Sequence, residues 1–278
     1  MLKRTITAVI AFAVFFPFLY FSDTFMLPLA MSILGLAGTY EMIGCVGLRK
    51  NVWIAVPSYL TAILLPQLSL MSDNSLPLVF AVAIVYMIFV FAATVFSRGK
   101  LDFTLAASAF TGVFYVTLSF TSIVYLREVG KYFYLLAFIG PWVSDTFAYL
   151  CGRLFGTHKL IPEVSPKKTV EGAIGGAVFA GIAYVIYAMI VSMMNDFTLE
   201  SNYLVMVLSG ALVSVISQIG DLIASVIKRR FGIKDYGWIF PGHGGVLDRF
   251  DSVLLTAPVL YILSQIPEMA SAFNGLLR

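Results

Sequence analysis

Two aspartates in the second half of the chain lie in hydrophobic runs, where an unpaired carboxylate is energetically costly. Asp145 and Asp221 each lie near the end of a long hydrophobic run. A carboxylate at the centre of a bilayer costs about 2.5–3.5 kcal/mol, and less near the interface, so it needs a partner or a function. Ser217, Asp221 and Ser225 recur every four residues and share one helix face, which Lys228 continues. This stripe is either a satisfied contact between helices or a polar wall on which Asp221 binds a metal ion.

The segment 228–251 follows this stripe and has three features of a site for phosphate and metal. Its basic cluster, residues 228–230, can meet phosphates or an anionic lipid leaflet. Three glycines permit positive φ angles and close backbone approach, as in an anion-binding nest: Gly242, Gly244 and Gly245. Asp248 and Asp251 offer two carboxylates, and magnesium commonly uses one or two carboxylates together with substrate phosphates.

Each of these features also has a simpler explanation. The basic cluster could obey the positive-inside rule, the glycines could make a tight turn, and Asp248 and Asp251 could cap a helix N-terminus. Their concentration within 24 residues favours the combined phosphate-and-metal site.

A second polar segment, residues 153–169, supplies matching groups. It follows a four-residue repeat of polar side chains: Asp145, Tyr149 and Arg153. It ends in two cations and a hydroxyl near the start of the next predicted helix, where phosphate binds favourably: Lys167, Lys168 and Thr169. The glycine and lysine order of a P-loop is missing here. A solvated basic loop that opens a helix is the alternative.

The elements that carry these residues are predicted to span a membrane. Of the 278 residues, 60% are hydrophobic and 12% charged, whereas soluble domains have about 45–50% and about 25%. Nine apolar runs approach the roughly 20 residues that a spanning helix needs: 5–21, 25–48, 52–70, 76–96, 103–125, 132–152, 170–194, 203–227 and 252–273. The first lacks a cleavage pattern and is expected to be retained. We predict an all-α, polytopic integral membrane protein with about nine transmembrane helices.

The distribution of basic residues predicts the orientation. With the N-terminus in the cytoplasm, 15 of the 18 lysines and arginines fall on the cytoplasmic side. Nine spans then place the C-terminus outside, and both polar segments, 153–169 and 228–251, face the cytoplasm. We expect an N-terminal packing bundle, residues 1–125, and a catalytic bundle, residues 126–278. Two cysteines and two histidines scattered along the chain make a zinc site improbable.

The segment from Ser225 to Asp251 resembles the pattern of the phosphatidate cytidylyltransferases, also called CDP-diacylglycerol synthases. The matching residues are Ser225, Lys228, Arg229, Lys234, Asp235, Pro241, His243, Gly244, Gly245, Asp248, Arg249 and Asp251. The stretches 145–156 and 165–172 are also similar to family motifs. Before residue 145, the resemblance rests on the hydrophobic spans alone.

The resemblance implies a membrane enzyme that transfers CMP from CTP to phosphatidic acid, and it implies a homodimer with a polar cavity open to lipid. It also implies a divalent cation, which we expect to be Mg²⁺, with a second cation conceivable and no nucleic-acid partner. Its suggested metal ligands are Asp221 and Asp248, with Asp251 nearby. Together with the residue patterns, it predicts a catalytic set: Asp221, Asp248, Asp251, Lys167 and Lys168. The predicted substrate-binding set is Ser165, Thr169, Ser225, Lys228, Arg229, His243, Gly244, Gly245, Arg249 and Asp145.

Two rival functions stay open at this point. A CTP-dependent polyprenol or phytol kinase would use a similar phosphate site, but a neutral hydroxyl would attack the γ-phosphorus. An ion-coupled transporter would use Asp145 and Asp221 along an ion path. The acids gather near one membrane face, which disfavours the transporter.

Overall fold

The computed structural model describes residues 17, 20–70, 76–195, 202–240, 242 and 244–277. Within these residues the chain is almost entirely helical, as expected for an all-α protein, apart from one short β-hairpin. The chain divides into two compact units. The first joins Met1–Val124 to Lys228–Phe250, and the second joins Tyr125–Ile227 to Asp251–Arg278.

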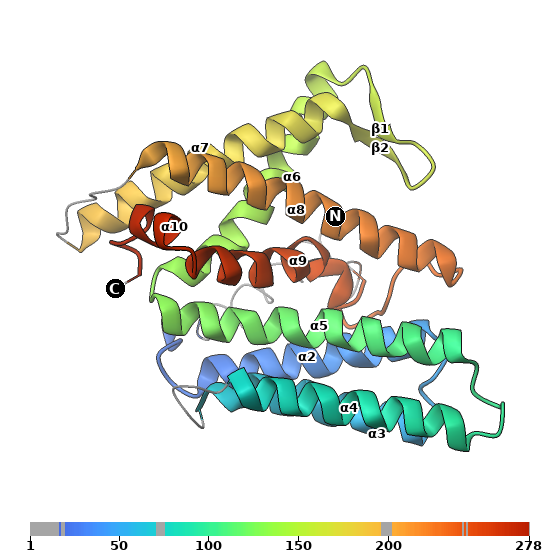
Figure 1. Cartoon of the computed structure of the whole chain (residues 1–278). Coiled ribbons are helices and arrows are strands. Elements are labelled where there is room, and N and C mark those ends of the chain that lie inside the picture. The colour runs from blue at the N-terminus through green and yellow to red at the C-terminus, as the bar shows by residue number, and fades with distance from the viewer. Residues whose placement is uncertain are drawn as a thin grey trace. The chain divides into compact units, whose positions relative to one another are not determined.

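The first unit is built mainly from four helices (Figure 1). They are α2 (Met26–Cys45), α3 (Val52–Gln67), α4 (Leu76–Phe96) and most of α5 (Phe103–Val129), with a 3₁₀ turn η1 (Leu68–Leu70) after α3. Close packing joins α2 to its neighbours, because a Cβ at Gly35 would meet the Ala62 carbonyl of α3 and Phe120 of α5. Aromatic rings fill the space between α4 and α5, where Tyr86 stacks on Phe110 at 5.8 Å.

The second unit carries the polar segment 153–169. Its elements are η2 (Phe133–Leu135), α6 (Leu136–Phe155), β1 (Lys159–Ile161), β2 (Ser165–Thr169), α7 (Val170–Met194) and most of α8 (Tyr203–Arg230). Helix α9 (Leu247–Ser264) begins in the first unit and continues into the second, which ends with α10 (Pro267–Ala272). The segment predicted as a loop therefore contains an antiparallel hairpin, with Lys159 opposite Thr169 and Ile161 opposite Ser165.

Small residues allow α6 and α7 to pack closely. A Cβ at Gly172 would lie 2.5 Å from the Ala148 carbonyl oxygen, and one at Gly176 would lie 2.9 Å from that of Ser144. The two helices thus bring the end of α6 against the start of α7, where the hairpin begins and ends.

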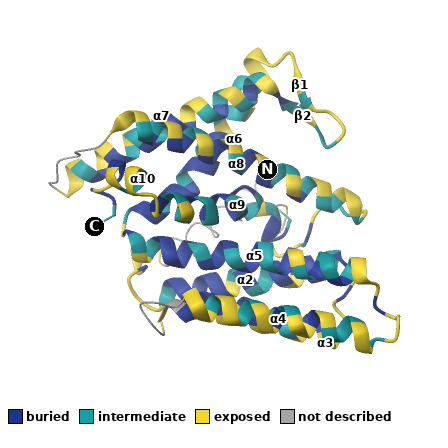
Figure 2. Ribbon diagram, viewed as in Figure 1, coloured by how far each residue is buried: buried dark blue, intermediate teal, exposed yellow. Residues whose placement is uncertain are grey.

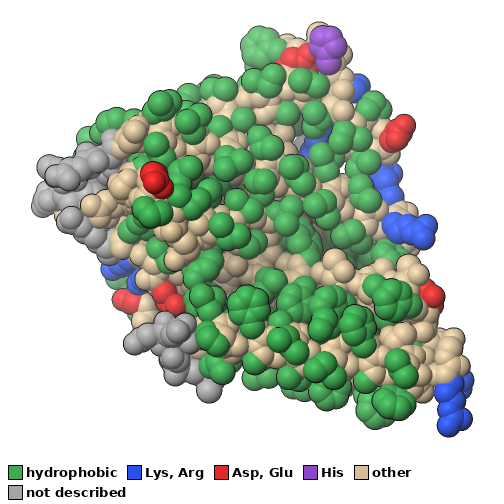
Figure 3. Space-filling view, in the orientation of Figure 1, with side chains coloured by type: hydrophobic (Ala, Val, Ile, Leu, Met, Phe, Trp, Pro, Cys, Tyr) green, Lys and Arg blue, Asp and Glu red, His purple; other side chains and the backbone are tan. Residues whose placement is uncertain are grey.

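Six described helices are long and apolar enough to cross a membrane, which agrees with an integral membrane protein. They are α2, α4, α5, η2 with α6, α7 and α8. Large hydrophobic side chains are exposed on them, for example Phe96 at 82% and Ile88 at 57%. Exposed positions recur along these helices (Figure 2), and hydrophobic side chains cover much of the visible surface (Figure 3).

The predicted count of nine spans is not confirmed. Residues 5–21 lie almost wholly outside the described part of the chain. Helix α3 has 16 residues and is short for a span. The predicted span 252–273 is divided, because α9 ends at Ser264 and Pro267 starts α10. A proline disfavours the helical conformation of the residue before it, and Ile266 is extended, with ψ 121°.

Candidate active site

A pocket of about 360 Å³ opens in the second unit, where α6, the hairpin, α7 and α8 meet. Its wall brings together five residues that the sequence selected: Asp145, Lys167, Lys168, Thr169 and Asp221. Tyr149 and Arg153 of the predicted four-residue repeat also line it. A pocket of this size is typical of small-molecule sites, and its charged groups suit an anionic ligand together with a cation.

Helix α7 and the hairpin place the two lysines on this wall. Thr169 is the N-cap of α7, and its hydroxyl accepts a hydrogen bond from the Gly172 N–H at 3.2 Å. The preceding residues, Lys167 and Lys168, lie on β2 and reach the pocket from there. The predicted position of these cations at the start of the seventh helix is therefore confirmed, although they belong to a strand.

Glu171, in the first turn of α7, holds the other end of the hairpin. Its Oε1 accepts hydrogen bonds from the Thr157 hydroxyl at 2.7 Å and from the His158 N–H at 3.1 Å. The His158 ring Nδ1 also lies 2.7 Å from this oxygen. These contacts fix the start of the hairpin to the helix that follows it.

Two opposite charges of the pocket wall, on Lys168 and Asp221, form an ion pair. Lys168 Nζ lies 2.6 Å from Asp221 Oδ2, and both side chains are partly exposed, at 25% and 30%. The lysine predicted to hold phosphate and the aspartate predicted to hold metal thus form an ion pair. In this structure the charge of Asp221 is therefore met by a lysine of the chain itself.

Asp145 is connected to the predicted site residue Asp251 through a serine. The Ser252 hydroxyl lies 2.9 Å from Asp145 Oδ2 and 3.3 Å from Asp251 Oδ1. The Ser252 N–H also donates to Asp251 Oδ1 at 2.9 Å. Gly220 allows α8 to approach the backbone of α9 closely, since a Cβ there would lie 2.7 Å from the Asp251 carbonyl oxygen. The sequence analysis did not select Ser252.

Buried polar contacts hold the helices below the pocket. The Ser144 and Ser214 hydroxyls lie 2.7 Å apart and join α6 to α8. The Gln218 amide donates to the Ala173 carbonyl at 3.2 Å and to Ser214 at 3.1 Å, so α8 is also joined to α7. Gln218 lines the pocket, one turn before Asp221.

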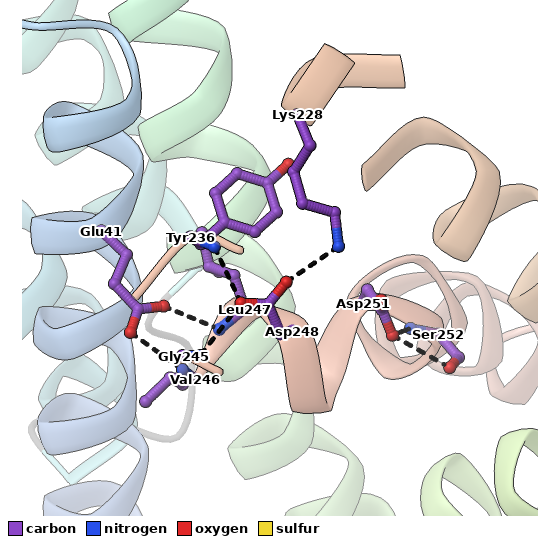
Figure 4. Close-up of polar contacts among 9 residues, drawn as sticks. All are labelled: Glu41, Lys228, Tyr236, Gly245, Val246, Leu247, Asp248, Asp251 and Ser252. Atoms are coloured by element: carbon purple, nitrogen blue, oxygen red, sulfur yellow. Dashed lines mark hydrogen bonds and ion pairs between the residues drawn. The ribbon is translucent and has the colours of Figure 1, made fainter. Parts of the chain in front are cut away.

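Two predicted site residues of the first unit, Lys228 and Gly245, contact a third, Asp248, in the first turn of α9 (Figure 4). Its Oδ1 accepts from Lys228 Nζ at 2.8 Å, and its Oδ2 accepts from the N–H groups of Tyr236 and Gly245 at 2.8 and 2.9 Å. The Asp248 side chain is only 5% exposed. Asp248 therefore organises the glycine-rich segment whatever else it binds.

A residue that the sequence analysis missed, Glu41 of α2, stands behind this turn. Its carboxylate accepts the N–H groups of Val246 and Leu247, each at 2.9 Å. Glu41 is 1% exposed. A lone acid inside the predicted span 25–48 was the available signal, since the same membrane cost singled out Asp221.

The glycines of this segment play different parts. Gly242 and Gly244 have positive φ angles, 78° and 83°, as predicted. Gly245 instead leaves space, because a Cβ there would clash with the Glu41 carboxylate. Its N–H donates to Asp248, so the chain's own carboxylate takes this part of the predicted anion nest.

The remaining predicted site residues lie outside the pocket lining or outside the described part of the chain. Ser165 begins β2, Ser225 lies on α8 after Asp221, and Arg229 and Arg249 are exposed. His243 lies outside the described residues. The roles given to these residues stay predictions.

The pocket residues fit a magnesium ion in chemical type. Asp145 and Asp221 supply carboxylate oxygens, and an ammonium group already lies against Asp221. Within the described ranges, no three His, Cys, Asp or Glu side chains form a metal-binding group. Magnesium bound here would complete its coordination with water and substrate phosphates, as it commonly does.

Comparison with known proteins gives a consistent result over nearly the whole chain. A family model described as the cytidylyltransferase family matches residues 2–266. A phosphatidate cytidylyltransferase of Staphylococcus haemolyticus (strain JCSC1435) is 37% identical over 265 residues, covering 94% of this chain and 97% of that protein. Similar proteins of the same name from Staphylococcus saprophyticus and Staphylococcus aureus (strain COL) are each 36% identical, with the same coverage.

Proposed function

The chain belongs to the cytidylyltransferase family, and we propose that it transfers the CMP unit of CTP to phosphatidic acid. The products are CDP-diacylglycerol and pyrophosphate. The observation that carries this proposal is the match to phosphatidate cytidylyltransferases over 94% of the chain. A pocket with lysines and carboxylates, in a protein with membrane-spanning helices, suits a reaction between a nucleotide and a lipid.

The reaction is a displacement at phosphorus. An oxygen of the phosphatidic acid phosphate forms a bond to the α-phosphorus of CTP, and the bond from that phosphorus to the β-phosphate bridging oxygen breaks. The bond electrons leave with pyrophosphate. Because the nucleophile is already an anion, the main difficulty is repulsion between two negatively charged reactants. Catalysis then consists chiefly of positioning and charge neutralisation.

The basic residues of the pocket supply that neutralisation. Lys167 and Lys168 reach the pocket from β2, and Arg153 reaches it from the last turn of α6. We assign these three cations to substrate phosphates. Lys168 is paired with Asp221, and we propose that it exchanges this contact for a phosphate oxygen when substrate binds, which would leave Asp221 available to the magnesium ion. Thr169 and Ser165 lie on the same strand and are assigned to substrate binding.

Asp221 and Asp248 are assigned to magnesium, with Asp251 as a further candidate. When bound, the ion would neutralise phosphate charge and stabilise the leaving pyrophosphate. The chain's own part is to hold carboxylate oxygens ready. Asp145 and Asp221 do so on the pocket wall, whereas Asp248 would have to share oxygens that accept from Lys228, Tyr236 and Gly245. A second cation is a further part of this proposal.

The segment 228–251 is assigned to both substrates' phosphates. The residues proposed for this role are Ser225, Lys228, Arg229, His243, Gly244, Gly245 and Arg249. Lys228 donates to Asp248, so its role includes orienting this carboxylate as well as meeting phosphate.

We further propose that the protein lies in the cytoplasmic membrane, with its N-terminus and both polar segments on the cytoplasmic side and its C-terminus outside. CTP is a soluble cytoplasmic nucleotide, so its site must be reached from there. We also propose that the protein forms a homodimer.

Labelled substrates provide the direct test. Purified protein in detergent would be incubated with phosphatidic acid, Mg²⁺ and CTP labelled at the α-phosphorus. The proposal expects label in a lipid and release of pyrophosphate. In a parallel reaction with γ-labelled CTP and a polyprenol in place of phosphatidic acid, label in the lipid would identify a kinase instead. Ion flux into sealed vesicles without CTP, with no labelled lipid, would identify a transporter.

A further inference from the structure

A buried acid of the first unit, Glu41, holds the turn from which Asp248 projects (Figure 4). Its two carboxylate oxygens accept one N–H each, from Val246 and Leu247. These amides stand at the start of α9, where backbone N–H groups have no partner within the helix. Both hydrogen bonds are 2.9 Å long, and a carboxylate acceptor strengthens a hydrogen bond relative to a neutral one.

The preceding amide of the turn, that of Gly245, is bound by Asp248 itself. Gly245 N–H donates to Asp248 Oδ2, so three consecutive amides, 245–247, are held by two carboxylates. Two positions of the connection between α8 and α9 also pack against Glu41, since a Cβ at Gly237 or at Gly245 would clash with its carboxylate. A movement of Glu41 must therefore displace the backbone on which Asp248 is mounted.

We propose that Glu41 is a positioning residue, which acts on the reaction through Asp248. It fixes the turn 245–247 and thereby the direction in which Asp248 presents its carboxylate. This inference rests on the proposed role of Asp248 as a magnesium ligand. Groups that orient a metal ligand typically change metal affinity by about 10–100-fold when they are removed.

The test compares wild type with Glu41→Gln in lipid nanodiscs. Glutamine replaces one acceptor oxygen by an NH₂ group, which then faces a backbone N–H, so one of the two hydrogen bonds must be lost. We expect faster amide hydrogen exchange in peptides covering 244–250. We also expect about 10-fold weaker binding of Mn²⁺, followed by electron paramagnetic resonance in the presence of CTP. Glu268→Gln, which changes an exposed acid of α10, is the control.

Two further measurements separate positioning from general support of the fold. Glu41→Asp keeps both acceptor oxygens on a shorter side chain and should give values between wild type and Glu41→Gln. The magnesium concentration for half-maximal activity should rise more than the KM for phosphatidic acid. If Glu41→Gln does not fold, Glu41→Asp decides by the same two readouts.

The failures of the two proposals look different. If wild type binds no Mn²⁺ while Glu41→Gln still loosens 244–250, the role of Asp248 as a metal ligand fails and the positioning of Asp248 stands. If wild type binds Mn²⁺ and neither exchange nor affinity changes in the Glu41 variants, the positioning role is overturned. Exchange that rises equally in α3 and α4 peptides also overturns it, because Glu41 would then support the whole unit.

Discussion

At the scale of single residues, each carboxylate of the candidate site has its own donors. Asp221 has the ammonium group of Lys168, Asp145 has the Ser252 hydroxyl, and Asp248 has Lys228 and two backbone amides. An acid in or near a membrane costs less when its charge is met in this way. The same donors define what each substitution must disturb.

Asp221→Asn should lower turnover by about 100-fold or more, or ~2.7 kcal/mol in transition-state free energy. Asparagine is nearly isosteric but lacks the charge that binds a divalent cation and pairs with Lys168. Initial rates at increasing Mg²⁺ would measure the loss, and thermal unfolding would check the fold. Asp102→Asn, which retains a side-chain acceptor for the Leu105 N–H, is the control. Near-normal activity with an unchanged magnesium requirement would remove Asp221 from the site.

Lys167→Gln and Lys168→Gln should each lower kcat/KM for CTP or phosphatidic acid by about 10–100-fold, which corresponds to ~1.4–2.7 kcal/mol. Arginine should restore activity only in part, because a planar guanidinium and a compact ammonium meet phosphate oxygens differently. Lys50→Gln, at an exposed cation of the first unit, should be neutral. If both pocket variants kept wild-type kinetics for both substrates, these lysines would be merely solvated charges of a basic connector.

At the scale of elements, the hairpin β1–β2 and helix α7 together deliver the lysines to the pocket. The register pairs Lys159 with Thr169, and Thr169 caps α7, so strand and helix share one junction. Close packing of α6 on α7 at Gly172 and Gly176 sets this junction beside Asp145. A change that displaces the hairpin should therefore affect the pocket by moving the lysines that the hairpin carries.

Glu171→Gln should loosen the hairpin and reduce kcat/KM by up to about 100-fold, the cost of a misplacement of roughly 1 Å. The variant weakens the acceptor of Thr157 and His158, which tie the start of the hairpin to α7. Hydrogen exchange in 157–169 should rise together with the kinetic loss. Glu163→Gln, an exposed acid between the two strands, is the matched control. Unchanged exchange in 157–169 would contradict this role of Glu171.

At the scale of the whole molecule, six described helices are long and apolar enough to cross a membrane, and many of their large hydrophobic side chains are exposed, as a lipid environment requires. The proposed orientation in the membrane rests on charge, since the basic residues concentrate in alternate predicted connections. We propose that the pocket and the segment 228–251 each face the cytoplasm, where CTP is available.

Single cysteines test this orientation after Cys45 and Cys151 have been replaced. Cysteines at Lys159 and Lys234 should resist an impermeant thiol reagent added to intact cells, because both lie on the proposed cytoplasmic side. A cysteine at the exposed Lys131, on the proposed outer side, should react. All three should react after the cells are opened. The reverse labelling pattern in intact cells would reject both the orientation and the cytoplasmic site.

The sequence by itself determined the class of this protein and selected part of the lining of its candidate site. Hydropathy and charge are sums over neighbouring residues, so they predicted membrane helices, and five selected residues do line one pocket. The resemblance carried by Ser225–Asp251 predicted the family that the comparison later showed.

Tertiary structure alone decided which groups meet. Glu41 and the amides of Val246 and Leu247 are separated by 205 and 206 positions, and Lys168 meets Asp221 across two different elements. No local pattern encodes such pairs, because they depend on how helices pack. The hairpin inside 153–169 and the break before Pro267 were likewise missed, since a short strand and a capped turn leave little mark on average hydropathy. The packing of the helices therefore determined which of the polar residues in the sequence form contacts with one another.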